Sequence, residues 1–463
     1  MTTRIPVTQS CFPQHSFWSE NYGPYEPSAP LSGDVTADVA VVGAGFTGLC
    51  AALRLRQLEP SLRVVVLEQE SIGYGASGRN SGWVWPNFSS YEHIRSRWGL
   101  EILRMSYDYA RQACEYVKEL VQTHTLNSEF REVGLLRPSV SAEFESDRLA
   151  FVRLCEDMGR GHRISAVPRE QLQEEFRSPL FHQALWDEEL ALIQPIKHVR
   201  SLCAAVRASG AVVYEQTPVF QINEGEDRIH LETPQGNVIA DRLLIATGAY
   251  THLLGGLDQY RLSRHQHPVF VYNSVTRPLS DAEWVTLGWP RRNAIYTFGP
   301  YQHFGHPTLD GRLHWCSDRF VGVPCGQAMH HEYQAGYRRT MEHETALFFP
   351  SLAGVPSTHH WGGAVSATID QIFHLGTLDR RGRIYMAFGD NGNGVALAHL
   401  NGRVVAERLL GVKSDVSEVW MMGRKPSLWP SHGFAALAIR GYLAAARWSN
   451  RRRARKSRFP VQC

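Results

Sequence analysis

The sequence predicts an α/β fold whose first part binds a dinucleotide. Residues 39–42, VAVV, form a short β-branched run of the kind found in a strand buried on both faces of a sheet. The glycine-rich turn GAGFTG follows at residues 43–48 and leads into a helical pattern that continues to Leu58. A second β-branched run, RVVVLE, then ends at Glu68. This order of strand, glycines, helix, strand and acid predicts a parallel βαβ unit.

The turn has the spacing G-x-G-x-x-G, and each glycine has a physical role. Gly43 permits the tight turn, Gly45 lets the backbone approach a pyrophosphate, and Gly48 lets the helix pack closely on the strand. The N–H groups that begin the helix favour an anion. Glu68 can accept hydrogen bonds from a ribose, which favours FAD or NAD over NADP. The contacts expected here are Gly43, Ala44, Gly45, Phe46, Thr47, Gly48, Glu68 and Gln69.

The next stretch, GYGASGRNSGWVWP at residues 73–86, separates FAD from NAD. An NAD domain would continue into strand–helix repeats, whereas this stretch is long and has no amphipathic period. Small residues let its backbone lie against a flat ligand, and Arg79 and Asn80 can serve a pyrophosphate or a ring edge. The contacts expected here are Ala76, Ser77, Arg79, Asn80, Ser81 and Gly82. We expect Trp83 and Trp85 to pack in the core, with a wall beside the flavin as the alternative.

These motifs resemble the D-amino-acid-oxidase-like FAD oxidoreductases, and GFTGL with GASGRNSG is most similar to the γ-glutamylputrescine oxidase branch of that family. The resemblance implies noncovalent FAD and a small-molecule amine or amino acid, with γ-glutamyl and secondary amines included. It implies oxidation of the C–N bond to an imine by hydride transfer to flavin N5. Imine hydrolysis and reoxidation of the flavin by O2 or an electron carrier would follow.

The resemblance also implies cofactor contacts further along the chain. Residues 200–219 look like the family's helix and strand, and DRLLIATGAY looks like the strand that ends in A-T-G. GDNGNGV would open a helix whose amides face the flavin's carbonyl edge. The implied contacts are Val219, Ala246, Thr247, Gly248, Gly389, Asn391, Gly392, Asn393, Gly394 and Val395. Two departures are Phe373, where relatives commonly have Pro, and Asn393, where they have His; Asn393 can still donate a hydrogen bond.

The implied architecture is a Rossmann-like FAD-binding domain interleaved with an α+β substrate domain on an antiparallel or mixed sheet. The FAD-binding domain takes residues 36–95, 195–262 and 346–412. The substrate domain takes residues 96–194 and 263–345, and residues 413–463 form a helical extension with a basic tail. From the residues themselves, 101–125 is a long helical pattern and 311–322 alternates like a half-buried strand.

Oxidation of an amine by flavin needs little acid–base machinery, so we expect no motif for the catalytic residues. The candidates lie on or near the substrate-domain strands: Tyr296, Tyr301, His303 and Arg319. The arginine could bind a substrate carboxylate, and a tyrosine could cap the amine or the carboxylate. His265 and His267 are further candidates of the same standing, and His374 fits a position near the flavin ring and a core histidine equally well.

Composition limits the other classes of function. A net charge of +3 gives no indication of a nucleic-acid partner, and the start of the chain lacks the layout of a signal peptide. The 8 cysteines include no CxxC pair, which favours reduced thiols in a cytoplasmic enzyme. The doublets His330–His331 and His359–His360 point in different directions along a helix or strand, so we expect no metal.

Residues 451–458, RRRARKSR, are expected to be a solvated tail. The less favoured interpretation is an anionic membrane surface or a partner, because the preceding FAALAIRGYLAAARW could form an amphipathic helix. Two alternatives to an amine oxidase or dehydrogenase remain open at this point. One is an NAD(P)H-dependent flavoprotein reductase or hydroxylase, which the lack of a second complete G-x-G-x-x-G disfavours. The other is a non-enzymatic, membrane-associated flavoprotein.

Overall fold

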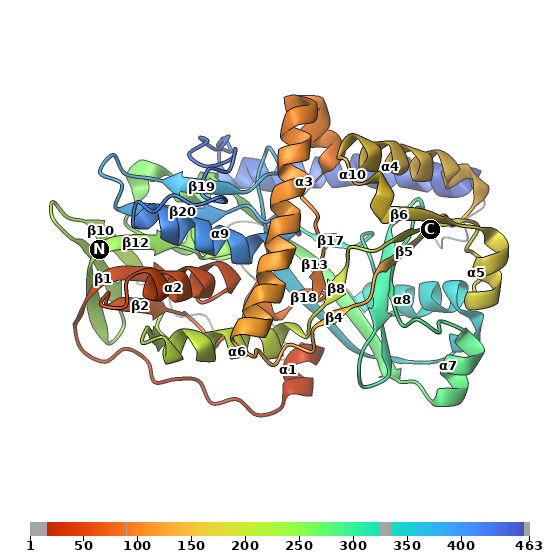
Figure 1. The fold of residues 1–463 in the computed structure, drawn as a ribbon, viewed down its shortest axis with the longest axis horizontal. Helices are drawn as coiled ribbons and strands as arrows, with labels where there is room; N and C mark the ends of the chain where they lie inside the picture. The colour runs from red at the N-terminus through yellow and green to blue at the C-terminus, as the bar shows by residue number, and fades with distance from the viewer. Residues whose placement is uncertain (1–15, 89, 325–334, 458–463) are drawn as a thin grey trace.

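A computed structural model describes residues 16–88, 90–324 and 335–457 of the chain. Two sheets lie side by side, with the long helix α3 (Tyr91–Thr123) between them (Figure 1). A three-stranded sheet of β3 (Trp83–Val84), β8 (Ala191–Leu192) and β4 (Arg131–Glu132) pairs segments that are far apart in the sequence. The expected α/β fold class is confirmed.

The first sheet is built around β1 (Val35–Val42). Parallel strands flank it: β2 (Val64–Leu67) and then β9 (Val212–Tyr214) on one side, and β12 (Gly236–Ile245) and then β20 (Ile384–Phe388) on the other. The antiparallel strands are β10 (Gln221–Glu224), β11 (Ile229–Thr233) and β19 (His374–Thr377). The helices α2 (Phe46–Leu58), α6 (Pro195–Ala208) and α9 (Gly394–Leu409) pack with Val39 and Val41, whereas Ala40 and Val42 face a second apolar cluster. The first strand is therefore buried on both faces, as predicted.

The second sheet has nine strands and is mixed, because β14 runs parallel to β5 while the other pairs are antiparallel. Its strands are β5 (Leu135–Pro138), β6 (Ile164–Val167), β7 (Ala184–Asp187), β13 (His267–Pro278), β14 (Ala294–Tyr296), β15 (His303–Pro307), β16 (Arg312–Ser317), β17 (Val321–Gly322) and β18 (Ser357–Ala367). Helix α8 (Ala335–Phe348) packs on one face of this sheet.

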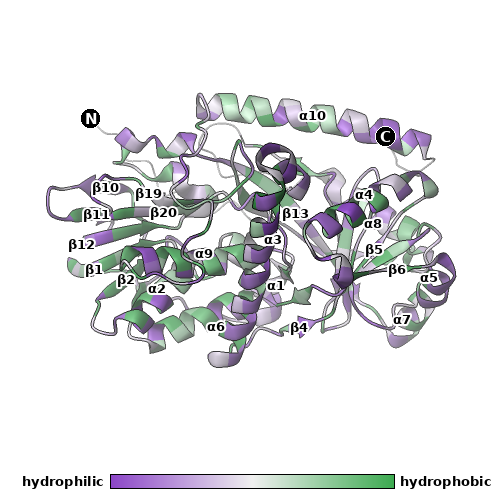
Figure 2. Cartoon of the chain, turned by 45° about the horizontal axis from the view of Figure 1, so that its top comes forward, coloured by the Kyte–Doolittle hydropathy of each residue, from purple (hydrophilic) through white to green (hydrophobic). Residues whose placement is uncertain are grey.

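Smaller helices surround the two sheets. These are α1 (Phe17–Tyr22), α4 (Glu145–Asp157), α5 (Arg169–Glu175) and α7 (Asp281–Leu287). The helix α10 (His432–Lys456) lies along the outside and crosses both parts of the molecule (Figure 2). Among the described residues, no helix is both long and apolar enough to cross a membrane.

The structure differs from the sequence predictions in three places. The helix expected at residues 101–125 begins at Tyr91, with a kink at Gly99, whose φ is 85°. Residues 357–367 were assigned to the FAD-binding domain, but β18 pairs with β13 over most of its length and so belongs to the second sheet. The strand expected to be half-buried, β16, is buried from Leu313 to Ser317, because β13 and β15 flank it and α8 covers it.

Candidate cofactor and substrate site

The turn between β1 and α2 requires glycine at two positions. Gly43 has a φ of 102°, and a Cβ there would lie 2.5 Å from the carbonyl oxygen of Ala246. A Cβ on Gly48 would lie 1.9 Å from the carbonyl oxygen of Gly43. Gly45 caps the helix in an extended conformation and offers no side-chain cap. The first turn of α2 therefore presents backbone N–H groups that an anion can use.

Glu68 stands at the carboxyl end of β2, beside this turn. Its carboxylate accepts the N–H of Ala44 at 2.9 Å and the N–H of Glu70 at 3.1 Å. Burial raises the pKa of Glu68, and these two hydrogen bonds work against that rise. The N–H of Thr217 donates to the backbone carbonyl of Glu68 at 2.8 Å, which brings the segment leading to Val219 alongside. The carboxyl edge of a parallel sheet is where such folds bind nucleotides.

The loop at residues 76–82 is built largely from its own polar side chains. Ser77 Oγ accepts the N–H of Phe46 at 3.0 Å, which joins the loop to the first turn of α2. Asn80 Oδ1 accepts the N–H of Gly82 at 2.8 Å, and its Nδ2 donates back into the loop. The guanidinium of Arg79 donates to the carbonyl oxygens of Tyr74 at 2.6 Å and Gly362 at 3.2 Å. In this arrangement Arg79 lies among protein carbonyls and fixes the loop to β18.

Side chains from outside the loop hold its backbone carbonyls. Asn273 Nδ2 and Trp361 Nε1 donate to the carbonyl of Arg79 at 3.2 and 2.9 Å. Trp18 Nε1 donates to the carbonyl of Asn80 at 2.9 Å, and His306 Nε2 donates to that of Ser81 at 3.0 Å. Sequence reasoning missed these four residues, which come from four separate segments and share no motif.

A second uncapped helix start lies at α9, which packs against α2 (Figure 1). A Cβ on Gly402 of α9 would lie 2.3 Å from the carbonyl oxygen of Thr47 in α2, so the two helices approach closely. Asn393 caps α9 without a side-chain hydrogen bond to it, although its Oδ1 accepts Nδ2 of Asn87. Asp390 accepts the N–H groups of Gly392 and Ser366, which fixes the loop before the helix.

FAD fits this arrangement. The glycine turn and the open start of α2 match a pyrophosphate, Glu68 matches a ribose, and the open start of α9 matches the electron-rich edge of a flavin. Ala246, Thr247 and Gly248 follow the end of β12 at the same edge of the sheet, and the N–H of Ala246 donates to the carbonyl of Val42 at 2.9 Å. These residues would hold the group through backbone contacts.

Trp83 and Trp85 pack against the second sheet. Trp83 stacks edge-on against Tyr296 with ring centroids 6.0 Å apart, and Trp85 lies 5.8 Å from the same ring. Both tryptophans are half-buried, and among the described residues neither buried indole N–H has a partner. The predicted packing role is therefore seen, with the packing partners supplied by β14 and β15.

Arg137 on β5 lies within this aromatic group and is 5% exposed. Its guanidinium carbon is 3.7 Å from the ring centroid of Phe151, 4.6 Å from Phe298, 5.2 Å from Tyr296 and 5.5 Å from Trp85. Among the described residues it has no hydrogen-bond acceptor, and burial lowers its pKa. The run LLRP contained the signal that sequence reasoning missed: an arginine inside an apolar strand.

The four residues named from the sequence for substrate contact divide between the two faces of the second sheet. Tyr296 pairs with Phe304 in register, so both point toward Trp83 and away from α8. His303 is on the opposite face, where its Nε2 lies 2.8 Å from Oε2 of Glu344 on α8.

Arg319 and Tyr301 lie with His303 rather than with Tyr296. Arg319 donates to Oε1 of Glu344 at 2.9 Å, and its guanidinium lies 5.2 Å from the Tyr301 ring centroid. Burial would raise the pKa of Glu344, but His303 and Arg319 outweigh it and hold that pKa below its usual value. Tyr301, His303 and Arg319 thus gather with Glu344 on the face of the sheet that α8 covers.

The remaining histidine candidates and Cys316 are buried, although Nδ1 of each of the three histidines has no hydrogen-bond partner among the described residues. His265 Nε2 contacts the carbonyl of Tyr260 at 2.9 Å, and His374 Nε2 contacts Asp370 at 3.0 Å. His267 is buried, and burial lowers its pKa to about 4. Burial raises the pKa of the Cys316 thiol to about 12, which disfavours the nucleophilic thiolate.

The histidine doublets were weighed as metal ligands. His330–His331 lie outside the described residues, and His359 Nε2 contacts Glu20 at 3.0 Å. Within the described ranges, no group of three or more His, Cys, Asp or Glu side chains could hold a metal ion.

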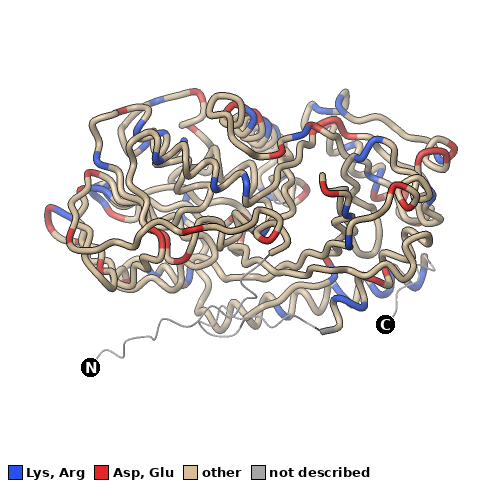
Figure 3. The backbone as a smooth tube through the Cα atoms, turned by 90° about the horizontal axis from the view of Figure 1, so that it is seen from below, with Lys and Arg blue, Asp and Glu red and all other residues tan. Residues whose placement is uncertain are grey.

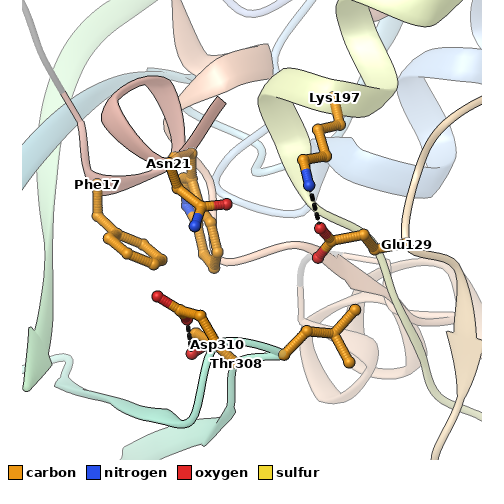
Figure 4. Close-up of a pocket in the computed structure, with 8 residues that line it drawn as sticks. Phe17, Asn21, Glu129, Lys197, Thr308 and Asp310 are labelled. Carbon is orange, nitrogen blue, oxygen red and sulfur yellow. Dashed lines mark hydrogen bonds and ion pairs between the residues drawn. The ribbon is translucent and has the colours of Figure 1, made fainter. Parts of the chain in front are cut away.

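A cavity of about 280 Å³ is lined by residues of α1 and by Glu129, Lys197, Thr308 and Asp310 (Figure 4). Lys197 is paired with Glu129, and Asp310 accepts the hydroxyl of Thr308 at 2.6 Å. Asp310 also pairs with Arg312 at 2.8 Å, so each charged side chain that lines the cavity has a partner of opposite charge within the protein.

Comparison with known proteins agrees with the site. The family described as "DAO: FAD dependent oxidoreductase" matches residues 38–408. The chain is 28% identical to gamma-glutamylputrescine oxidoreductase of Escherichia coli (strain K12), over 86% of this chain and 89% of that protein. It is also 28% identical to the probable oxidoreductase OrdL of Rhizobium meliloti (strain 1021), over 90% and 92%.

Solved structures show the same fold. Glycine oxidase from Geobacillus kaustophilus superposes with a TM-score of 0.69 at 20% identity, covering 84% of this chain and 99% of that one. L-proline dehydrogenase from P. horikoshii gives 0.70 at 17% identity, covering 85% and 97%. Neither alternative from the sequence is supported by these relatives. The first was an NAD(P)H-dependent flavoprotein reductase or hydroxylase, and the second was a non-enzymatic flavoprotein. The chain is an enzyme of the DAO family of FAD-dependent oxidoreductases.

Proposed function

We propose that the protein oxidises the C–N bond of a small amine that carries a carboxylate, with FAD as noncovalent cofactor. FAD supplies the acceptor for the hydride removed from carbon. The chain's own residues bind the carboxylate, align the substrate and restrict the access of water. Amine and amino-acid substrates are the ones named for gamma-glutamylputrescine oxidoreductase and glycine oxidase among the relatives.

The observation that carries the proposal is the buried guanidinium of Arg137. A cation removed from water is costly unless an anion or hydrogen bonds compensate for it, and aromatic faces supply part of that compensation. Asp187, a buried carboxylate on β7 that acts electrostatically on Arg137, is already paired with Arg160. A substrate carboxylate would accept two parallel hydrogen bonds from Arg137.

A chain of contacts connects Arg137 to the cofactor edge. Its guanidinium lies beside the Trp85 ring, and Trp85 is two residues from Asn87. Asn87 in turn donates to Asn393, which caps α9. A substrate with its carboxylate on Arg137 would therefore extend along Trp85 and Tyr296 toward the open start of α9. Tyr296 would orient the amine end of the substrate, while Tyr301, His303 and Arg319 would brace the sheet from behind.

Steady-state kinetics of the Arg137→Met variant tests this assignment. The substrates are paired amines that differ only in whether they carry a carboxylate. Loss of two charge-assisted hydrogen bonds, about 2–3 kcal/mol in total, predicts a KM for the carboxylated amine that is raised by about 30- to 150-fold. The KM for the uncharged amine should change little.

The matched control is Leu136→Met, one residue earlier on β5, whose side chain packs in the cluster that contains α8. It should leave the ratio of the two KM values unchanged. If Arg137→Met changes the KM of both amines equally, Arg137 does not bind the substrate carboxylate. Reduction of the flavin by NAD(P)H, without reduction by any amine under anaerobic conditions, would contradict the reaction itself.

A further inference from the structure

The helix α10 has its large apolar side chains on the outside. Phe434 is 51% exposed, Leu437 69%, Tyr442 67% and Trp448 62%, whereas the buried positions are taken by the small residues Ala435, Ala436 and Ala454. A helix that only packs on a protein shows the reverse order, with its large apolar residues inside. The outward side chains of this helix therefore contact nothing in the described part of the chain that would remove them from water.

Three of the four large exposed residues, Phe434, Leu437 and Trp448, lie on one side of the helix, whereas Tyr442 lies off it. Leu437 is three residues after Phe434, and Trp448 is fourteen after Phe434, close to four helical turns. Arg452 and Arg455 follow Trp448 at four and seven residues, so they continue the same stripe toward the C-terminal end of the helix. The guanidinium of Arg452 lies 4.7 Å from the Trp448 ring centroid. We call the stripe Phe434, Leu437, Trp448, Arg452 and Arg455 the outer face of α10.

The charge of the helix has one sign. Residues 432–456 contain seven arginines and lysines and no aspartate or glutamate, and blue bands follow this helix toward the C-terminus in Figure 3. Three arginines anchor it to the protein: Arg440 donates to the carbonyl of Val323 at 2.7 Å, Arg447 to that of Val321 at 3.3 Å, and Arg453 pairs with Asp147. Arg452 and Arg455 have no such acidic partner among the described residues and are exposed.

We propose that the outer face of α10 docks the enzyme on the surface of a membrane whose headgroups are anionic. Phe434 and Leu437 would enter the boundary between headgroups and acyl chains, and the indole of Trp448 would lie at the headgroup level. Arg452 and Arg455 would meet the lipid phosphates. Anchored at three points along its length, the helix would lie flat on the surface, and the enzyme would stay outside the bilayer.

Charge complementarity selects this occupant over a second copy of the chain. An antiparallel pair of α10 helices would bring the basic end of each onto the apolar half of the other, and a parallel pair would oppose the arginines directly. Neither pairing provides an acidic residue, since the helix has none. An anionic lipid surface satisfies the apolar and the basic part of the stripe together.

Cosedimentation of the full-length holoenzyme with vesicles tests the proposal. We expect binding to vesicles of phosphatidylcholine mixed with phosphatidylglycerol, weak binding to phosphatidylcholine alone, and loss of binding as the salt concentration rises. Arg452→Gln with Arg455→Gln should weaken partitioning by about 25-fold, at about fivefold for each charge near an anionic surface. Leu437→Ser should weaken it by about tenfold.

The matched control is Val285→Ser on α7, which removes an apolar residue that is 72% exposed elsewhere on the surface. It should leave vesicle binding unchanged, and all variants should keep the amine-dependent flavin reduction of the parent. Absence of binding to the phosphatidylglycerol vesicles would overturn the proposal. So would binding that the α10 variants leave unaltered, or a dimer in light scattering that Leu437→Ser dissociates.

Discussion

The indole N–H of Trp361, on β18 of the substrate-domain sheet, donates a hydrogen bond to the backbone carbonyl of Arg79 in the cofactor loop at 2.9 Å. A buried carbonyl that loses its donor retains the cost of desolvation. The same carbonyl also accepts Asn273 Nδ2 at 3.2 Å, so two side chains that are distant in the sequence position the loop together.

Replacing Trp361 by Phe should weaken FAD binding by about fivefold. One buried hydrogen bond contributes about 1 kcal/mol, and its loss leaves the loop at residues 76–82 less firmly positioned. The dissociation constant can be measured by titrating apoprotein with FAD and following flavin fluorescence. Trp315→Phe is the matched control, since Trp315 is equally buried and its indole N–H has no partner among the described residues. Equal weakening in both variants would show that ring packing, and not the hydrogen bond, positions the loop.

Glu68→Gln should weaken FAD binding by about 10- to 100-fold while the protein stays folded. The amide keeps an acceptor for the N–H of Ala44 but loses the charge that strengthens hydrogen bonds to a ribose. Calorimetric titration with FAD measures the change. Glu70→Gln, two residues further along the chain, should bind FAD as the parent does. If both variants lose affinity alike, the acidic character of this edge of the sheet matters and the ribose contact does not.

Gly45→Val should yield a folded but colourless protein. A Cβ at this position meets only Ser77 Oγ, at 3.0 Å, so the fold tolerates it, whereas the branched side chain would occupy the path of the pyrophosphate. The visible absorption of the purified protein reports the cofactor content. Gly433→Val, at a site with open space around it, controls for the substitution itself. A yellow Gly45→Val protein with full FAD content would refute the cofactor site.

Glu344→Gln should lower the free energy of unfolding at pH 7 by about 3 kcal/mol, since it leaves Arg319 and His303 buried without their carboxylate. The folded pKa of Glu344 lies below its usual value of 4.5, so the stabilisation is complete above that pH and is lost as the pH falls below it. Urea unfolding at neutral and acidic pH should show the two proteins converging in acid. A pH-independent difference would mean that the carboxylate acts by packing alone.

The βαβ unit was predictable because its residues are consecutive. The order from Val39 to Glu68 contains the strand, turn, helix and acid within one βαβ unit, and each glycine answers a local steric demand. The loop at residues 76–82 was equally predictable as a close-approaching segment, since glycine, serine and asparagine stabilise it within a few residues.

The substrate half depends on sheet order, which no local pattern encodes. Arg137 and Tyr296 lie far apart in the sequence and meet because β5 and β14 pair in parallel. Successive side chains of a strand point to opposite faces of the sheet, so His303 and its sequence neighbour Phe304 lie on different faces. Chemical type alone favoured Arg319 for the substrate carboxylate, but Glu344 on α8 neutralises it.

The end of β18 also determines how the two parts of the molecule can move. Ser366 accepts hydrogen bonds from the N–H groups of Asn391 and Gly389 and donates its own N–H to Asp390. Three hydrogen bonds thus join β18 to the loop before α9. Trp361 on the same strand binds the loop at residues 76–82. Strand β18 therefore connects the second sheet both to that loop and to the segment before α9. A rotation that moved the two sheets apart would break these hydrogen bonds. Substrate exchange is therefore expected through local movement of side chains and loops at constant distance between the sheet and the cofactor.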